Sequence, residues 1–255
     1  MSRPITAGPA DGLACLCRGL VSAAEVAPGR RVLDVSTGTG EAALIALSAI
    51  GASGVVVGED IAPAMLVGAR DRLKNPLFCP VAADGQTLPF RSSSFDAIIC
   101  QLGLQFFPNP ARGLAEFHRV LRLGCCAALR VISTPDRAPM RGVADVLSQF
   151  VSEQRDLLYL SFALADANRL EHMHPSAGFC EVRVERVQRE DTISSFGEYW
   201  NPIKAGMGSM PQVYVALPET ERRAVRDEVK SRLSPFESNG HLTMSVEMLI
   251  GVGRA

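Results

Sequence analysis

Short apolar runs alternate with longer amphipathic stretches through the first half of the chain. Four of these runs have the length and composition of buried strands, and they lie at residues 32–35, 54–60, 77–82 and 95–101. The stretches between and after them are typical of helices, and they lie at residues 41–50, 61–74 and 111–123. Strands that alternate with helices predict an α/β fold built on a parallel sheet.

Helix boundaries are marked at several points. Asn109 and Pro110 form an N-cap and first-turn pair for the helix over 111–123, and we expect Gly124 to end it. Nearer the N-terminus, residues 11–27 have the apolar spacing of one amphipathic helix. That helix has two possible roles, covering the edge of the sheet or forming a lid over a cofactor.

The second half of the chain continues with weaker patterns. Apolar residues over 143–151 have helical spacing, and residues 180–187 alternate valines with charges, which is typical of an edge strand. Residues 216–235 predict a surface helix, and residues 242–253 predict the last strand. Because no repeat or clear linker interrupts the chain, we expect one domain over 1–255.

Composition excludes several classes of function. The 255 residues carry a net charge of −1, so no basic field favours nucleic acid or an anionic membrane surface. We see no signal peptide or apolar run of membrane-spanning length, and we expect a cytoplasmic protein. Seven cysteines and four histidines lack the spacing of a zinc site, so no metal is expected.

Residues 31–44, RVLDVSTGTGEAAL, are the stretch around which the rest is organised. They predict a strand, a glycine loop and a helix, the opening unit of a nucleotide-binding α/β domain. Gly38 and Gly40 allow the backbone to approach a ligand, and the N–H groups of the helix N-terminus face the same ligand.

Two cofactors fit this loop. Gly38, Gly40 and Ala43 match a dinucleotide fingerprint, and Asp60 lies at the distance expected for a ribose-binding acid. Asp34, however, places a carboxylate where a pyrophosphate requires N–H donors. The same carboxylate suits the ammonium group of S-adenosylmethionine, so we favour that cofactor over NAD.

Five motifs keep their order and spacing, namely VLDVSTGTG, VVVGEDIAPAML, ADGQTLPF, FDAIICQLGLQFFPNP and EFHRVLRLG. Over about residues 30–132 the chain resembles class I S-adenosylmethionine-dependent methyltransferases, most closely the small-molecule group that includes ubiquinone/menaquinone-biosynthesis enzymes. The resemblance implies a Rossmann-like sheet of seven strands in the order 3-2-1-4-5-7-6. The last strand is expected to be antiparallel, with helices on both faces. The resemblance also implies a small helical cap over the substrate, formed by insertions at about 136–165 and 192–216.

The resemblance also implies a set of cofactor-binding positions. The methionine end would lie at Asp34, at the loop Ser36, Thr37, Gly38 and Gly40, and at Gln101. Asp60 would hold the ribose, because a carboxylate at the end of the second strand accepts both hydroxyl protons. The adenine would meet Ile61, Met65, Ala83, Asp84 and Gly85, although Asp84 is equally typical of a turn.

The sequence differs from many of its relatives at the position where they have a candidate catalytic base. Many of them place a histidine after the fourth strand, whereas residues 104–107 here read Leu-Gln-Phe-Phe. His172 and His174 are therefore candidates for a catalytic base, and surface or packing roles are the alternative. Ser36 and Cys125 stand where relatives often have glycine.

We therefore expect a methyltransferase that aligns S-adenosylmethionine with an oxygen, nitrogen or carbon nucleophile for in-line displacement. The acceptor is expected to be a fairly apolar small molecule, because the predicted cap is rich in Leu, Phe and Met. The protein is expected to be a monomer or a homodimer. Two alternatives stay open, a protein that binds S-adenosylmethionine without turnover and an NAD(P)-dependent oxidoreductase.

Overall fold

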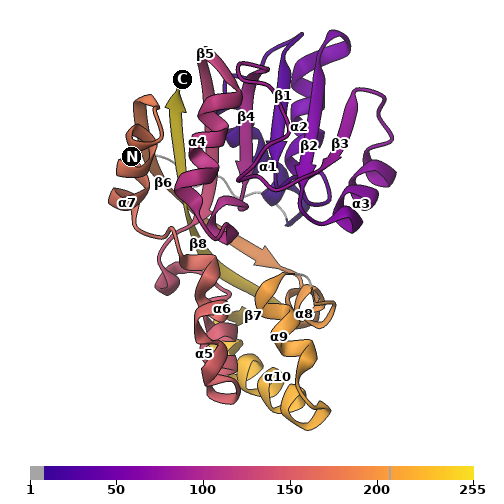
Figure 1. Cartoon of the computed structure of the whole chain (residues 1–255). Coiled ribbons are helices and arrows are strands. Elements are labelled where there is room, and N and C mark those ends of the chain that lie inside the picture. The colour runs from indigo at the N-terminus through magenta and orange to yellow at the C-terminus, as the bar shows by residue number, and fades with distance from the viewer. Residues whose placement is uncertain (1–8, 207) are drawn as a thin grey trace, which may run out of the picture. The chain divides into compact units, whose positions relative to one another are not determined.

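The computed structural model describes residues 9–206 and 208–255, and its main feature is one mixed sheet (Figure 1). The strands follow the order β3-β2-β1-β4-β5-β8-β6, and a short β7 pairs with β8 outside this row. Their bounds are β1 Arg31–Val35, β2 Val55–Asp60, β3 Phe78–Ala82, β4 Phe95–Gln101, β5 Leu121–Ile132, β6 Cys180–Ile193, β7 Glu237–Ser238 and β8 His241–Arg254.

Strand directions agree with the predicted topology. The pairs β1–β2, β1–β4, β2–β3 and β4–β5 are parallel, and β5–β8 is antiparallel. The predicted order counted seven strands, and the two-residue β7 shifts the number of the last long strand from seven to eight. The fold-class prediction is therefore confirmed.

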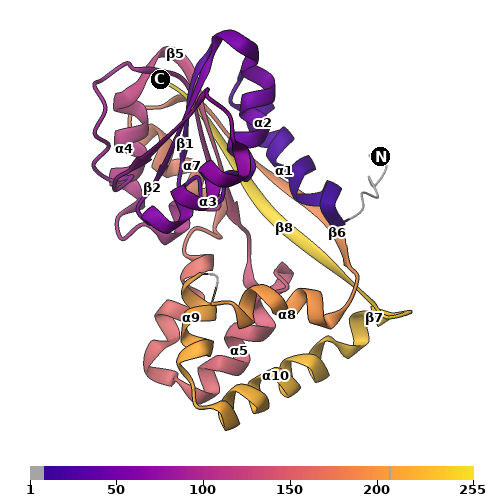
Figure 2. The same ribbon diagram turned by 90° about the vertical axis from the view of Figure 1, so that its right-hand side faces the viewer.

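The chain divides into two compact units. The larger comprises residues 13–132, 164–187 and 248–255. Its α-helices are α1 Pro9–Ala23, which begins before this unit, α2 Glu41–Ile50, α3 Pro63–Leu73, α4 Pro110–Val120 and α7 Ala167–Ser176. In Figure 2, α1 and α2 lie on one side of the sheet and α4 lies on the other.

Two hydrophobic clusters fill the two faces of this sheet because successive strand residues point in opposite directions. Leu33 of β1 packs in a first cluster with Phe117 of α4, whereas its neighbour Val32 packs in a second cluster with Leu20 of α1. Burial on both faces explains why β1, β2 and β4 are almost continuously apolar. A charged residue within one of these strands is therefore unusual and is a candidate for a functional role.

The helix predicted over 111–123 is shorter than expected. It begins as predicted, with Asn109 Oδ1 accepting a hydrogen bond from Arg112 N at 3.1 Å. It ends at Val120, and Leu121 starts β5, paired with Phe95 of β4. The prediction that Gly124 ends the helix is wrong, because pairing with β4 draws Leu121–Leu123 into the sheet.

The smaller unit comprises residues up to Gly12, 133–163 and 188–247. Its α-helices are α5 Arg141–Phe150, α6 Arg155–Tyr159, α8 Phe196–Lys204, α9 Ser209–Ala216 and α10 Glu219–Leu233. Short 3₁₀ turns across the chain lie at Gly51–Ser53, Leu104–Phe106, Pro135–Arg137, Ser152–Gln154, Leu160–Phe162 and Ser234–Phe236.

A third hydrophobic cluster forms the core of the smaller unit. Val225 and Val229 of the predicted surface helix are fully buried in it, which confirms the inner face of α10. Trp200 stacks on Phe196 with ring centroids 5.5 Å apart and is 3 % exposed. The tryptophan thus packs in a core. Both predicted cap segments fall mainly in this unit, and the single-domain organisation stays a prediction.

No helix in the described ranges is both long enough and apolar enough to cross a membrane.

Candidate functional site

Asp34 lies at the carboxyl end of β1, and its side chain is completely buried. Its Oδ2 accepts a hydrogen bond from Thr37 Oγ1 at 2.6 Å, which ties the carboxylate to the glycine loop. Its Oδ1 has no hydrogen-bond partner among the described residues. A buried carboxylate oxygen without a partner is costly, and a bound cationic group would satisfy it.

The loop from Ser36 to Gly40 turns back on itself through three residues with positive φ. Ser36 has φ 54°, Gly38 has φ 55° and Gly40 has φ 83°. A Cβ built on Gly38 would meet nothing within 4 Å, so the loop has open space at that point. A Cβ on Gly40 would lie 2.9 Å from Leu73 of α3, so this glycine is required for packing.

Asp60 ends β2 and fastens the glycine loop. Its Oδ2 accepts a hydrogen bond from Gly38 N at 2.9 Å, and its Oδ1 accepts one from Ala62 N at 2.9 Å. The side chain is 8 % exposed. Each carboxylate oxygen keeps a second acceptor position, so both remain able to receive a hydroxyl proton.

Glu59, the neighbour of Asp60, is a third buried carboxylate of this edge, and the sequence analysis did not select it. Alternation along β2 places it on the opposite face of the sheet from Asp60, with 1 % exposure. Its Oε2 accepts a hydrogen bond from Ser36 N at 3.3 Å. A charge within the apolar run VVVGED was the available signal.

Two of these carboxyl groups have strongly raised pKa values. Burial raises the pKa of Asp34 to about 7, although the hydrogen bond from Thr37 counteracts the effect. Burial raises the pKa of Glu59 to about 8, and the negative charges of Asp60 and Asp84 add to the effect. Such shifts are typical of functional sites.

The loop after β3 carries the predicted adenine positions. Ala83 N donates to Asp60 O at 3.2 Å, which joins this loop to the end of β2. Asp84 Oδ1 accepts a hydrogen bond from Gln86 N at 2.9 Å, the geometry of a turn residue. Gly85 is buried so tightly that a Cβ there would lie 2.4 Å from the Phe107 ring.

Ile61 and Met65 follow Asp60 at the start of α3. Ile61 is 73 % exposed, which is unusual for a large apolar side chain, and Met65 is half-buried. An exposed isoleucine immediately beyond Asp60 is available to cover an aromatic base. The adenine-binding role of Ile61 and Met65 stays a prediction.

Polar side chains also gather where β4 and β5 end. Gln101 Oε1 accepts a hydrogen bond from Arg130 Nη1 at 3.1 Å, and Arg130 is 1 % exposed. Gln105, also 1 % exposed, accepts a hydrogen bond from Ile132 N at 2.9 Å. The Nε2 atoms of Gln101 and Gln105 have no partner among the described residues. Sequence reasoning missed Arg130, although it is a lone charge in the apolar run AALRVI.

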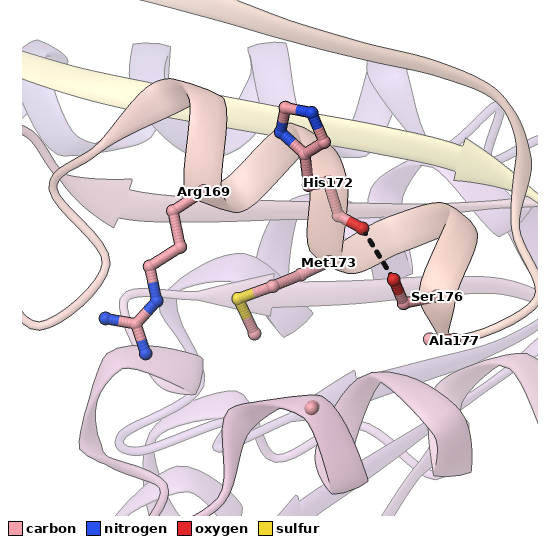
Figure 3. Close-up of a pocket in the computed structure, with 6 residues that line it drawn as sticks. Arg169, His172, Met173, Ser176 and Ala177 are labelled. Carbon is pink, nitrogen blue, oxygen red and sulfur yellow. Dashed lines mark hydrogen bonds between the residues drawn. The ribbon is translucent and has the colours of Figure 1, made fainter.

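The two candidate histidines lie in different surroundings on α7. His172 is exposed, and together with Arg169, Met173 and Ser176 it lines a pocket of about 470 Å³ between α7 and α4 (Figure 3). Its Nδ1 lies 2.6 Å from Asn168 O. These contacts involve none of the predicted cofactor residues.

His174 is fully buried against Phe179, with ring centroids 5.8 Å apart. Its Nδ1 lies 2.8 Å from Leu170 O, and burial lowers its pKa. Leu170 and Phe179 belong to the cluster on the sheet face opposite to Asp34. A catalytic role for either histidine stays a prediction that no contact supports.

Comparison with known proteins gives this geometry a context. Residues 33–129 match the family model described as a methyltransferase domain. Over this segment the chain is similar to methyltransferase domains. The segment includes β1, β2, β3, β4 and most of β5, and every predicted cofactor residue lies within it.

Part of the chain is similar to curated proteins. A ubiquinone/menaquinone biosynthesis C-methyltransferase from Stenotrophomonas maltophilia is 40 % identical over 111 residues. That alignment covers 42 % of this chain and 44 % of the relative, so the chain spans less than half of its relative's length. The chain therefore resembles class I methyltransferases of this group, as predicted.

Solved structures resemble the chain along most of its length. A putative methyltransferase from Bacillus halodurans has a TM-score of 0.63 at 21 % identity and covers 93 % of this chain and 97 % of its own. A phosphoethanolamine N-methyltransferase from Haemonchus contortus, in complex with S-adenosyl-L-methionine, has a TM-score of 0.59 at 17 % identity, with coverages of 94 % and 52 %. At such identities the likeness establishes the fold.

Proposed function

We propose that this protein transfers a methyl group from S-adenosylmethionine to a nucleophilic oxygen, nitrogen or carbon of a small-molecule acceptor. The observation that carries the proposal is the unpartnered oxygen of buried Asp34 beside the glycine loop. The methyltransferase-domain match over residues 33–129 supports it. So does the similarity of 42 % of the chain to a curated C-methyltransferase.

The residues present fit the cofactor. Asp34 Oδ1 is a buried acceptor suited to an ammonium group, and the open space at Gly38 leaves room for a ligand against the backbone. Asp60 has acceptor positions for two ribose hydroxyls. Ile61 would cover the adenine, and the loop from Ala83 to Gly85 would border it.

When bound, S-adenosylmethionine supplies an electrophilic methyl group on its sulfonium. The contribution of the protein is then mainly alignment and exclusion of water. Asp34 would fix the methionine end of the cofactor and Asp60 its ribose, so that its methyl group faces the acceptor. Both carboxylates are held by hydrogen bonds from the same loop, at Thr37 and Gly38, and their spacing is therefore set by one rigid turn.

Proton removal would depend on the acceptor. Residues 104–107 contain no group that titrates near neutral pH, and Gln105 is buried. An acidic phenol or enol, or a neutral amine, requires little assistance in losing its proton. The named role of the Stenotrophomonas relative, C-methylation in ubiquinone/menaquinone biosynthesis, is compatible with an apolar enol or phenol acceptor.

The first test is calorimetric titration with S-adenosylmethionine, S-adenosylhomocysteine and NADH. We expect micromolar binding of the two adenosyl ligands and no binding of NADH. Asp34→Asn and Asp60→Asn should each weaken binding by about 10- to 100-fold, because each removes a charge-assisted contact. Tight binding of NADH alone would refute the proposal.

The pH dependence gives a second test of Asp34. Its pKa of about 7 means that the carboxylate, the form that attracts an ammonium, becomes populated between pH 6 and 8. Affinity for S-adenosylhomocysteine should therefore rise over this range in the wild type and change less in Asp34→Asn. Equal pH profiles of the two proteins would exclude Asp34 as the ammonium ligand.

Turnover separates an enzyme from a binding protein. Radiolabelled S-adenosylmethionine incubated with a panel of phenols, enols and amines should label at least one acceptor. Binding without transfer to any member of a broad panel would favour a protein that binds the cofactor without turnover.

A further inference from the structure

Arg130 is among the largest fully buried side chains of the molecule, and it lies in the strand β5. Its neighbours in that strand, Leu129 and Val131, are core residues. A buried guanidinium is expensive to desolvate, and it occurs where it pairs with other groups or serves a ligand. Its position in the sheet indicates which ligand it would serve.

The register of the sheet places Arg130 on the same face as Asp34. Val32, Ile99 and Ala128 all belong to the second hydrophobic cluster. Residues two positions apart on a strand point to the same face of the sheet. Asp34, Gln101 and Arg130 follow Val32, Ile99 and Ala128 by two positions, so they point to the face that the second hydrophobic cluster covers. They lie on β1, β4 and β5, the three neighbouring strands, near the carboxyl ends of all three.

Spacing across these strands matches an amino-acid head group. β4 lies between β1 and β5, and Arg130 lies two residues beyond Ala128, the β5 residue in register with Asp34, so the Cα atoms of Asp34 and Arg130 are separated by about 12 Å. A methionine head group carries one ammonium and one carboxylate, the two charges that complement Asp34 and Arg130. Gln101, on the middle strand, accepts a hydrogen bond from Arg130 Nη1 at 3.1 Å and thereby orients the guanidinium.

Helix α1 closes this face over the same charges. A Cβ built on Gly19 would lie 3.5 Å from Arg130 Nη2, so the guanidinium reaches the helix. Burial raises the pKa of the Cys17 thiol to about 11, while the charge of Arg130 lowers it and that of Asp34 raises it. The charges of Arg130 and Asp34 thus both reach the buried thiol of Cys17 in α1.

We infer that Arg130 binds the carboxylate of the cofactor's methionine moiety, while Asp34 binds its ammonium group. The planar guanidinium offers two parallel N–H donors to a carboxylate, a match that lysine lacks. This inference rests on the proposed function, since it takes S-adenosylmethionine as the ligand. It assigns a cofactor-positioning role to a residue of β5.

The test compares S-adenosylmethionine with decarboxylated S-adenosylmethionine, which lacks only the carboxylate. In calorimetric titration, the wild type should bind the intact cofactor about 10- to 100-fold more tightly. Arg130→Met should reduce affinity for the intact cofactor by a similar factor and change affinity for the decarboxylated one by less than about threefold. Arg130→Lys should give an intermediate preference.

Arg119→Met is the matched control. Arg119 is an arginine of α4 whose side chain bonds Glu116 at 2.6 Å and the Phe90 carbonyl at 2.8 Å. Its replacement should leave the preference between the two ligands unchanged. Circular dichroism establishes that each variant is folded, and the wild-type preference tests the inference even if Arg130→Met does not fold.

The possible failures are distinct. A wild type that binds neither adenosyl ligand would refute the proposed function itself. A wild type that binds both ligands equally would overturn the role of Arg130 alone. So would an Arg130→Met variant that loses affinity for both to the same extent, because a purely structural arginine predicts that result.

Discussion

At the scale of single residues, the site is defined by charges that interrupt buried strands. Asp34, Asp60 and Glu59 lie at the ends of β1 and β2, and all three are nearly inaccessible to solvent. Asp34 and Asp60 were predictable because their positions follow apolar runs and precede turns. Alternation along β2 implied that only one of Glu59 and Asp60 faces the cofactor, but it could not reveal that both are buried.

Burial of Glu59 should make the stability of the ligand-free protein depend on pH. Its pKa of about 8 lies above the ordinary 4.5, so the folded state holds a proton that the unfolded state releases as pH rises. The folded protein should therefore lose stability between about pH 4.5 and 8. Glu59→Gln removes this loss and should raise the free energy of unfolding at pH 8 by about 2–4 kcal/mol.

Chemical denaturation at pH 5 and pH 8 measures this difference. Glu116→Gln is the control of opposite sign, because Arg119 lowers the pKa of Glu116 and its ionised form stabilises the fold. The control should destabilise the protein at pH 8. Identical pH dependences of Glu59→Gln and the wild type would show that Glu59 does not carry the raised pKa.

At the scale of elements, local signals predicted where helices begin better than where they end. The Asn109–Pro110 pair marked the start of α4 correctly because an N-cap is a local interaction. The end at Val120 depends on the pairing of Leu121 with Phe95, 26 positions earlier, and no local residue encodes it. Likewise β6 extends to Ile193, beyond the predicted 180–187, because β8 is there to pair with it.

The loop after β3 offers a test of packing at this scale. Alanine at Gly85 would place a Cβ 2.4 Å from the Phe107 ring and 3.1 Å from Val35, so Gly85→Ala should destabilise the protein by about 1–3 kcal/mol. Replacing Phe107 with leucine in the same chain should recover part of this loss. Thermal denaturation without ligand measures both effects.

Gly142 in α5 is the matched control for this substitution. A Cβ at that position would meet nothing within 4 Å, and alanine is favoured over glycine within a helix by about 0.5–1 kcal/mol. Gly142→Ala should therefore stabilise the protein. If Gly85→Ala were as stable as the wild type, the loop would not be packed as described.

At the scale of the whole molecule, the proposed cofactor site and the core that contains Trp200 lie in different units. All the proposed cofactor residues lie in the larger unit, which the family model matches in part. The motifs of that unit made its strand order predictable, and its cofactor positions stay a prediction. Patterns in the smaller unit predicted individual helices such as α10 but not their assembly, because helical spacing identifies a buried face without naming its partner.

The core of the smaller unit can be tested separately because it contains the only tryptophan. Val229 of α10 is fully buried in the same hydrophobic cluster as Trp200. Val229→Ala removes two methyl groups from that cluster and should lower the free energy of unfolding by about 1–3 kcal/mol, measured by tryptophan fluorescence in denaturant. Asp227→Ala, an exposed change on the same helix, should alter the free energy of unfolding by less than about 0.5 kcal/mol.

Neither substitution should change affinity for S-adenosylhomocysteine more than about threefold, because every proposed contact lies in the larger unit. A large loss of affinity in folded Val229→Ala would mean that the smaller unit contributes directly to the cofactor site.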